Sequence, residues 1–253
     1  MNIITIMNYQ NIDSNNVKMC KLFIKQLLHH NHDCNLFVLY EDNISKDITD
    51  YGSKFPNVKF IQRAGASDSW SDHHNIRYKL YNLTSIKEQF IFLDCDIFCL
   101  GDISYLWERR NDQPFIGINH QQIPGHTTQI GFQFLNSGVQ VVGDPDWYQY
   151  ENFRDTFKKC HGNMQCPGWD QAHIYRYCVM NDYDYTHPDV SYGWNSCAKY
   201  GNIIKCDNEW RGIYNGPADK RGLKTYQVYL NHYWWNFKPW SLNCPIFNEP
   251  VEI

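Results

Sequence analysis

Phe90-Ile91-Phe92-Leu93-Asp94-Cys95-Asp96-Ile97-Phe98 is the stretch of sequence that decides the fold, because an apolar run meets two carboxylates within it. The apolar run predicts a buried central strand that ends where the acids begin. Side chains two positions apart leave a strand on the same side. We therefore expect Asp94 and Asp96 to lie together at the carboxyl end of this strand.

Two neighbouring carboxylates need a partner. Charges ~4 Å apart repel by roughly 1 to 4 kcal/mol in water or near a protein surface unless a cation lies between them. Oxygen ligands at this spacing suit Mg²⁺ or Mn²⁺, with phosphate oxygens completing the shell. In open α/β sheets, ligands bind at the carboxyl ends of the strands. The alternative is a strand end with two solvated acids, and the two acids alone favour neither interpretation.

Length and composition limit the classes of protein. A chain of 253 residues suits one large α/β domain. The net charge of -4, from 23 basic and 27 acidic residues, leaves no basic surplus for nucleic acid. No apolar stretch approaches the ~20 residues of a membrane span, and a strand expected from Asn2 leaves no room for a signal peptide. The ten scattered cysteines suit reduced, buried thiols. We expect a cytoplasmic protein.

The first part of the chain alternates strands with helices. Short β-branched or apolar runs at Ile3–Met7, Asn35–Tyr40 and Val58–Ile61 predict strands, and apolar residues at helical spacing follow Asp13, a good N-cap residue. This alternation predicts an α/β fold with a central mixed, mostly parallel sheet flanked by helices.

Polar residues near the predicted strand ends are candidates for ligand contacts. Asn8 and Tyr9 follow the first strand, where the tyrosine ring suits a nucleobase, although an ordinary loop residue is at least as good an interpretation. A helix predicted over Ser71–Leu83 carries Arg77 and Lys79 off its apolar face and leads into the strand before Asp94. We expect these cations beside the two acids, with solvated surface positions as the alternative.

The middle of the chain adds a polar pair and a helix start. Asn136 and Ser137 interrupt an apolar strand over Gln133–Val142, so they are either bonded internally or face a ligand. Helices are predicted from Pro145 and from Pro167 to about Met180. Asp170 and Gln171 then lie in a first helical turn, either as helix-dipole residues or beside a sugar.

The last third loses its periodicity and then regains it. From Tyr183 to Gly222 we expect a long irregular segment, in which Trp194 and Asn195 suit a sugar ring or a structural role. Alternating apolar residues from Tyr226 to His232 predict a final strand. A single histidine at a strand end is usually structural, but next to two acids it becomes a candidate metal ligand.

Taken in order, these motifs resemble the retaining glycosyltransferases of family eight, the group of glycogenin and the bacterial galactosyltransferases, which have the GT-A fold. The similar segments are Phe92 to Asp96, the metal-binding strand; Lys79, a cation near the diphosphate; Leu135-Asn136-Ser137-Gly138-Val139; Asp170-Gln171 at the sugar; Trp194-Asn195 on the acceptor side; and His232 with Lys238-Pro239-Trp240 six residues later. The family has a glycine three residues after the histidine, where this chain has Trp235, which cannot give the same backbone access.

The resemblance implies one GT-A domain over residues 1–253, with a nucleotide-binding half of about 1–110 and an acceptor-side half of about 111–253. It implies Mn²⁺, with Mg²⁺ as the alternative, acting as Lewis acid on the diphosphate of a nucleoside diphosphate sugar, mostly UDP-linked in the family. It implies transfer of a hexose, with retention, to a glycan or a protein, and it allows self-glycosylation on a tyrosine and a homodimer. Retention leaves open a double displacement through Asp170 and the front-face attack that the family favours.

The positions in the chain and the resemblance together give these candidate roles: metal ligands, Asp94, Asp96 and His232; catalytic residues, Asp170, Gln171 and Lys238; donor-binding residues, Asn8, Tyr9, Arg77, Lys79, Asp94, Asn136, Ser137 and Lys238. Of these, Asn8, Tyr9 and Arg77 rest on position alone, and the loop after the first strand, which holds Asn8 and Tyr9, fits the family poorly. The rival interpretation is a non-catalytic carbohydrate-binding or nucleotide-binding module on the same fold, which Trp235 favours. A nucleotidyltransferase would also use strand-end acids, but no glycine-rich loop with Lys or Arg follows the first strand to hold a triphosphate.

Overall fold

The computed structural model describes residues 1–7, 13–67, 74–119, 135–160, 170–190, 194, 196–197, 201–206, 209–215, 225–233 and 238–251. A six-stranded sheet in the order β3-β2-β1-β4-β7-β6 forms the centre. The strands are β1 (Asn2–Ile6), β2 (Asn35–Tyr40), β3 (Val58–Gln62), β4 (Phe90–Leu93), β6 (Phe115–Asn119) and β7 (Leu135–Val142). Only β7 runs against the other five strands. The predicted mixed, mostly parallel α/β sheet is confirmed.

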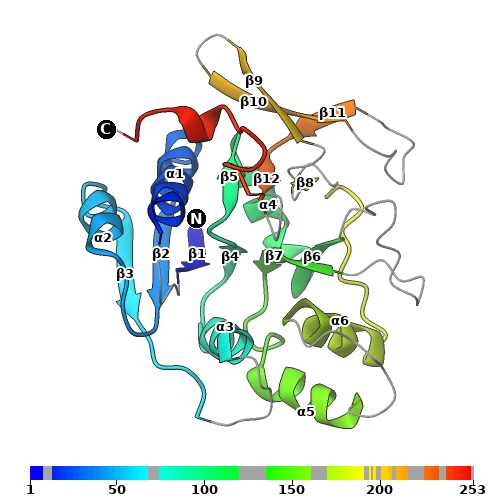
Figure 1. Cartoon of the computed structure of the whole chain (residues 1–253). Coiled ribbons are helices and arrows are strands. Elements are labelled where there is room, and N and C mark those ends of the chain that lie inside the picture. The colour runs from blue at the N-terminus through cyan, green and yellow to red at the C-terminus, as the bar shows by residue number, and fades with distance from the viewer. Residues whose placement is uncertain are drawn as a thin grey trace.

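Helices cover both faces of this sheet. They are α1 (Ser14–His30), α2 (Lys46–Gly52), α3 (His74–Thr84), α4 (Ser104–Glu108), α5 (Tyr150–Cys160) and α6 (Asp170–Met180), with 3-10 turns at Arg109–Asn111 and Ile246–Asn248. Figure 1 shows α1 and α2 beside β1, β2 and β3, while α3, α5 and α6 lie together at the bottom of the view. The predicted N-cap of α1 is confirmed, since the Asp13 carboxylate accepts a hydrogen bond from the Asn16 backbone N at 2.7 Å.

Successive residues of the central strands contribute to different core layers. Ile3 and Ile91 pack in the cluster that contains Phe23 and Leu27 of α1. The neighbouring residues Ile4 and Phe92 belong instead to the cluster with Leu80 and Leu83 of α3, Phe153 of α5 and Ile174 of α6. Because side chains alternate along a strand, the buried strands need apolar residues at every position, which is why Phe90–Leu93 is uniformly apolar.

Two small sheets extend the domain. One has the order β5-β12-β8, with β5 (Ile97–Cys99), β12 (Leu230–His232) and β8 (Ser196–Cys197). The other contains β9 (Gly201–Cys206), β10 (Glu209–Asn215) and β11 (Thr225–Val228), and it lies at the top of Figure 1. The first of these sheets brings the end of the chain beside the strand that follows β4.

The structure corrects three predicted elements. The helix predicted from Pro145 begins only at Tyr150, because residues 144–149 form turns closed by the Asp144 side chain and by the Gln149 amide, which donates to the Pro145 carbonyl at 2.7 Å. The segment expected to be irregular up to Gly222 contains the β9–β10 hairpin. The final predicted strand is divided between β11 and β12, which belong to different sheets.

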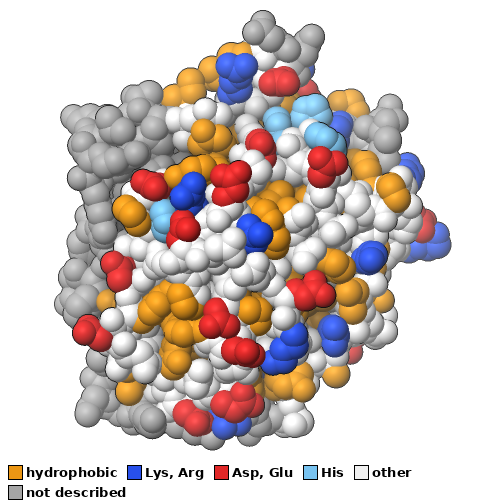
Figure 2. Space-filling model, turned by 180° about the vertical axis from the view of Figure 1, so that it is seen from behind, with side chains coloured by type: hydrophobic (Ala, Val, Ile, Leu, Met, Phe, Trp, Pro, Cys, Tyr) orange, Lys and Arg blue, Asp and Glu red, His pale blue; other side chains and the backbone are white. Residues whose placement is uncertain are grey.

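No helix among the described residues is long and apolar enough to cross a membrane. The face turned away from the viewer in Figure 1 carries acidic and basic side chains that are interspersed with one another and with hydrophobic side chains (Figure 2). The described residues on this face form no extended area of a single charge sign.

Candidate metal and donor site

The two aspartates lie on a tight turn that joins β4 to β5. The Ile97 backbone N donates to the Asp94 carbonyl at 3.2 Å, and the Asp94 backbone N donates to the Gly138 carbonyl of β7 at 2.8 Å. We predicted that the acids would be close because side chains two apart on a continuous strand point to the same side. In the structure they are instead brought together by the turn at the end of β4. Their position after the buried strand is the predicted one.

His232 reaches this turn from the far end of the sequence. β12 pairs antiparallel with β5, which places His232 opposite Ile97, and the Tyr233 backbone N donates to the Asp96 carbonyl at 2.9 Å. The His232 Nε2 atom lies 3.1 Å from Asp96 Oδ1 and 3.7 Å from Asp94 Oδ2. One donor atom from each of these three residues lies within 4.8 Å of the other two.

Two lysines bind the outer oxygens of the same acids. Lys79 Nζ is 3.1 Å from Asp94 Oδ1, and Lys238 Nζ is 2.8 Å from Asp96 Oδ2. The remaining oxygens, Asp94 Oδ2 and Asp96 Oδ1, are the ones beside the imidazole. Two carboxylate oxygens and one imidazole nitrogen that converge in this way fit a divalent cation, with the other coordination positions left for water or phosphate oxygens.

The two carboxylates differ in how firmly they hold their charge. Burial alone raises the pKa of Asp96, but His232 and Lys238 outweigh it and hold this pKa well below its usual range. For Asp94, burial is the largest influence and leaves the pKa raised, although Lys79 and His232 act against it. Asp96 is thus the more firmly ionised of the two candidate ligands.

Lys79 also connects the acids to the start of α6. Its Nζ lies 2.7 Å from Asp170 Oδ2, 3.2 Å from the Ser137 carbonyl oxygen and 4.3 Å from the centre of the Phe92 ring. Burial by itself lowers the pKa of Lys79, but Asp170 and Asp94 outweigh burial, and the net shift is upward. For Asp170, burial raises the pKa, and Lys79 more than offsets this, so the net shift is downward. Both groups are therefore charged at neutral pH.

A buried hydrogen-bond chain behind Lys79 was not predicted. Gln140 Nε2 donates to the Ser137 carbonyl at 2.7 Å, and the Tyr148 hydroxyl donates to Gln140 Oε1 at 2.6 Å. Gln140 and Tyr148 are almost completely buried. Gln140 was a third polar residue in an otherwise apolar strand, which was the signal in the sequence for this network.

The remaining residues predicted to contact the donor or the sugar lie in several different environments. Asn136 Oδ1 accepts a hydrogen bond from the Gly138 backbone N at 2.9 Å, which is the internal bonding we gave as one alternative. Arg77 lies on α3 with its Nε buried, two residues before Lys79, and its place beside the acids stays a prediction. Gln171 follows Asp170 in the first turn of α6, as predicted. Asn8, Tyr9, Asn195 and Trp235 lie outside the described residues.

Trp194 has a structural environment. Its ring stacks on Tyr229 at 4.0 Å between centres and on Tyr105 at 5.7 Å, and only 6% of the residue is exposed. A sugar ring would need an open aromatic face, so the structural alternative is the better interpretation of this residue.

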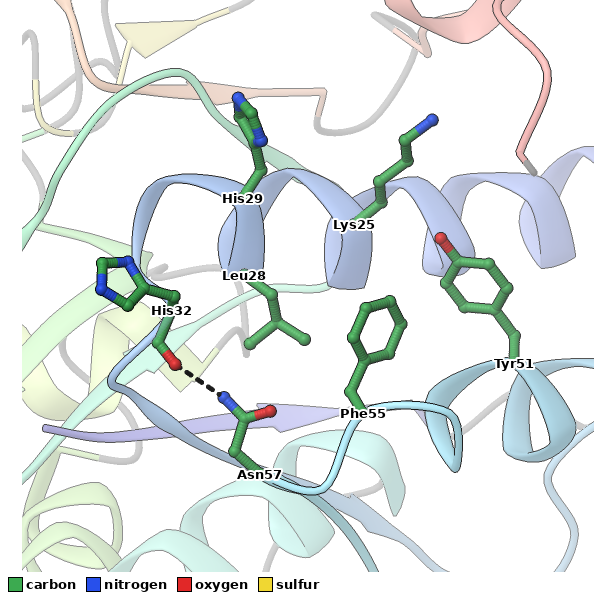
Figure 3. A pocket seen from close by; sticks show the side chains of 7 residues that line it. All are labelled: Lys25, Leu28, His29, His32, Tyr51, Phe55 and Asn57. Carbon is green, nitrogen blue, oxygen red and sulfur yellow. Dashed lines mark hydrogen bonds between the residues drawn. The ribbon is translucent and has the colours of Figure 1, made fainter. Parts of the chain in front are cut away.

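A separate cavity of about 280 Å³ lies between α1 and α2. Figure 3 shows the residues that line it: Lys25, Leu28, His29, His32, Tyr51, Phe55 and Asn57. The Asn57 amide donates to the carbonyls of His32 and Cys34, just before β2. The cavity therefore lies at the amino-terminal ends of the parallel strands, whereas the aspartates follow the carboxyl end of β4, and it has no part in the candidate site.

Solved structures match this arrangement of strands and helices. An active-site mutant of LgtC has a TM-score of 0.61 at 13% identity, over 96% of this chain and 91% of that one. The galactosyltransferase LgtC, solved with donor and acceptor sugar analogues, has a TM-score of 0.58 at 14% identity, over 98% of this chain and 92% of that one. The chain has the GT-A fold.

A third GT-A structure, the glycosyltransferase GlyE of Streptococcus pneumoniae TIGR4, has a TM-score of 0.60 at 13% identity, over 99% of this chain but only 60% of that one. No protein-family model matches the sequence, and no curated protein matches it significantly. The GT-A fold expected from the order of the motifs is confirmed, and at these identities the structural likeness establishes the fold alone.

Proposed function

We propose that the chain is a metal-dependent, retaining glycosyltransferase that moves a hexose from a UDP-sugar to a glycan or protein acceptor. The observation that carries this proposal is the convergence of Asp94, Asp96 and His232 at the carboxyl end of β4 in a GT-A fold. Mn²⁺ or Mg²⁺ held by these residues would act as Lewis acid on the leaving diphosphate.

The lysines explain how the protein would stabilise the departing diphosphate. Lys79 and Lys238 are already held on the outer oxygens of the aspartates, so their positions need no reorganisation when negative charge develops beside them. A general basic surface is unnecessary under this proposal, because two fixed cations and the metal meet the phosphates locally. This is consistent with a net charge of -4.

The environment of Asp170 bears on the retaining mechanism. A double displacement needs a carboxylate nucleophile free to attack the sugar carbon. The Asp170 side chain is 15% exposed and forms an ion pair with Lys79 at 2.7 Å. This ion pair lowers the nucleophilicity of the carboxylate. This favours a positioning role for Asp170 and Gln171 at the sugar, with the acceptor attacking from the side of the leaving diphosphate.

The decisive experiment measures release of free nucleoside diphosphate from a panel of nucleotide sugars with Mn²⁺. Asp96→Ala should abolish both donor hydrolysis and transfer, whereas Asp33→Ala, which removes a carboxylate with 94% side-chain exposure, should leave both unchanged. Undiminished turnover in Asp96→Ala would refute the metal-dependent mechanism. Donor binding by the wild type without turnover, across metals and acceptors, would select the non-catalytic module instead.

The stereochemistry needs its own measurement. The anomeric configuration of the product, read by NMR at early times, should match that of the donor. An inverted product would refute retention while leaving the transferase proposal intact.

A further inference from the structure

Gly138 of β7 lies directly against the imidazole of His232. A Cβ atom built on Gly138 would lie 2.2 Å from His232 Cε1, 2.8 Å from His232 Nδ1 and 2.9 Å from Asn136 Oδ1. Gly138 lies within a regular strand, and its φ is outside the left-handed region, so the backbone itself would accept other residues. Contact with His232, and to a lesser degree with Asn136 Oδ1, is therefore what excludes a side chain here.

The same residue also fixes one of the acids. The Gly138 carbonyl accepts a hydrogen bond from the Asp94 backbone N, and the absence of a side chain on Gly138 leaves room for the His232 ring. Gly138 of β7 is therefore adjacent to two of the three candidate ligands. His232 is 97% buried and is held from the other side by the pairing of β12 with β5. An added methyl group would lie 2.2 Å from the ring, so restoring an ordinary contact distance of at least 3.4 Å would push the ring more than 1 Å away from Gly138, against β5.

We infer that Gly138 determines which divalent cations this site prefers, by leaving room for His232 to act as its nitrogen ligand. The inference rests on the proposed metal-dependent function. The affinity of an imidazole nitrogen is lower for Mn²⁺ than for Co²⁺, while Mg²⁺ prefers oxygen ligands. If the ring moves, Asp94 and Asp96 remain as an oxygen site. Affinity for Co²⁺ and Mn²⁺ should then fall while affinity for Mg²⁺ persists.

The test is metal binding without substrate. The affinities for Mg²⁺, Mn²⁺ and Co²⁺ are measured by calorimetry, and Mn²⁺ also by electron paramagnetic resonance, for the wild type, Gly138→Ala and His232→Ala. Both variants should lose about 10-fold to 100-fold in Co²⁺ affinity, somewhat less for Mn²⁺, and less than about threefold for Mg²⁺. Gly52→Ala is the matched control, since its Cβ would lie 2.5 Å from Phe60 Cζ, away from the site, and it should change no metal preference.

A double variant keeps the inference testable if Gly138→Ala folds poorly. In Gly138→Ala/His232→Ala the imidazole is gone and the 2.9 Å contact with Asn136 Oδ1 remains, so the alanine should cost clearly less stability than it does in the wild type, and metal affinities should equal those of His232→Ala. Such non-additivity is expected for residues in contact, whereas distant, independent sites add. A full cost of the alanine in the His232→Ala background would overturn the inference, as would failure of the double variant to fold.

The failures of the two proposals can be told apart. A wild type that binds no divalent cation would refute the metal-dependent function and this inference with it. A wild type that prefers Co²⁺ and Mn²⁺ over Mg²⁺, together with a Gly138→Ala variant of unchanged preference, would overturn the role of Gly138 alone.

Discussion

Replacement of Lys79 by methionine tests the charge network most directly. Methionine keeps the volume and the contact with Phe92 but removes the cation 3.1 Å from Asp94 Oδ1 and 2.7 Å from Asp170 Oδ2. Breaking a buried ion pair by removing one partner costs about 3 to 5 kcal/mol. The side chains of Lys79, Asp94 and Asp170 are 13%, 32% and 15% exposed, which points to the lower end, about 3 kcal/mol at neutral pH.

Urea unfolding followed by fluorescence of the nine tryptophans measures this loss. The matched control is Lys46→Met, which breaks the exposed pair with Asp50, whose side chains are 85% and 58% exposed. Such exposed pairs contribute little to stability, because solvent screens their charges. Equal losses in Lys79→Met and Lys46→Met would refute the claim that the site acids depend on Lys79.

The pH dependence of the loss has a definite sign. Lys79 holds the pKa of Asp170 below its ordinary value, so this interaction stabilises the fold above the unfolded pKa of about 3.9 and is lost as the pH falls through the folded value. In Lys79→Met, burial instead raises this pKa, and protonation relieves the unpaired charge. The difference from the wild type should be largest near pH 7 and shrink toward about pH 4. A constant difference over this range would contradict the assignment of the effect to Asp170.

Two further outcomes are expected. Mn²⁺ at 100 times its dissociation constant should stabilise the wild type by about 2.7 kcal/mol, and a chelator should reverse this stabilisation. An equal rise of the melting temperature in Asp96→Ala would contradict binding at the candidate site. Tyr148→Phe should cost about 1 to 3 kcal/mol in urea unfolding, because Gln140 Oε1 loses its buried donor. Tyr81→Phe, on a ring with 41% exposure, should cost much less, and a similar loss in both would contradict the role of the Gln140 bond.

Local sequence patterns predicted the elements whose residues carry their own structural signal. The uniformly apolar Phe90–Leu93 segment identified the central strand, and Asp13 identified the start of α1. The β9–β10 hairpin was missed because it belongs to a separate small sheet with a small buried face, in which Val228 is buried and Ile203 and Trp210 are only partly buried, while Ile204 is 40% exposed. The start of α5 was placed too early, because Pro145 suits a turn as well as a first helical position.

The candidate site was predicted by residue type but not by contact. The order of the motifs named His232 and Lys238, whereas their distances from Asp96 depend on the pairing of β12 with β5, which no local pattern specifies. The bridge from Lys79 to Asp170 likewise depends on the packing of α3 against α6. Gln140 carried a weak signal as a polar residue in a buried strand, and Tyr148 carried none, since a buried tyrosine is common.

The pairing of β12 with β5 has a consequence for biosynthesis. Lys238 and Asp96 are 142 positions apart, so the charges around the acids are balanced only after residue 238 has left the ribosome. A nascent chain that has already formed β4 would carry two adjacent carboxylates without their histidine and one of their lysines. The candidate cation site should therefore mature only after its histidine and second lysine are available, and under the proposed function a divalent ion bound there would favour completion of the fold at that step.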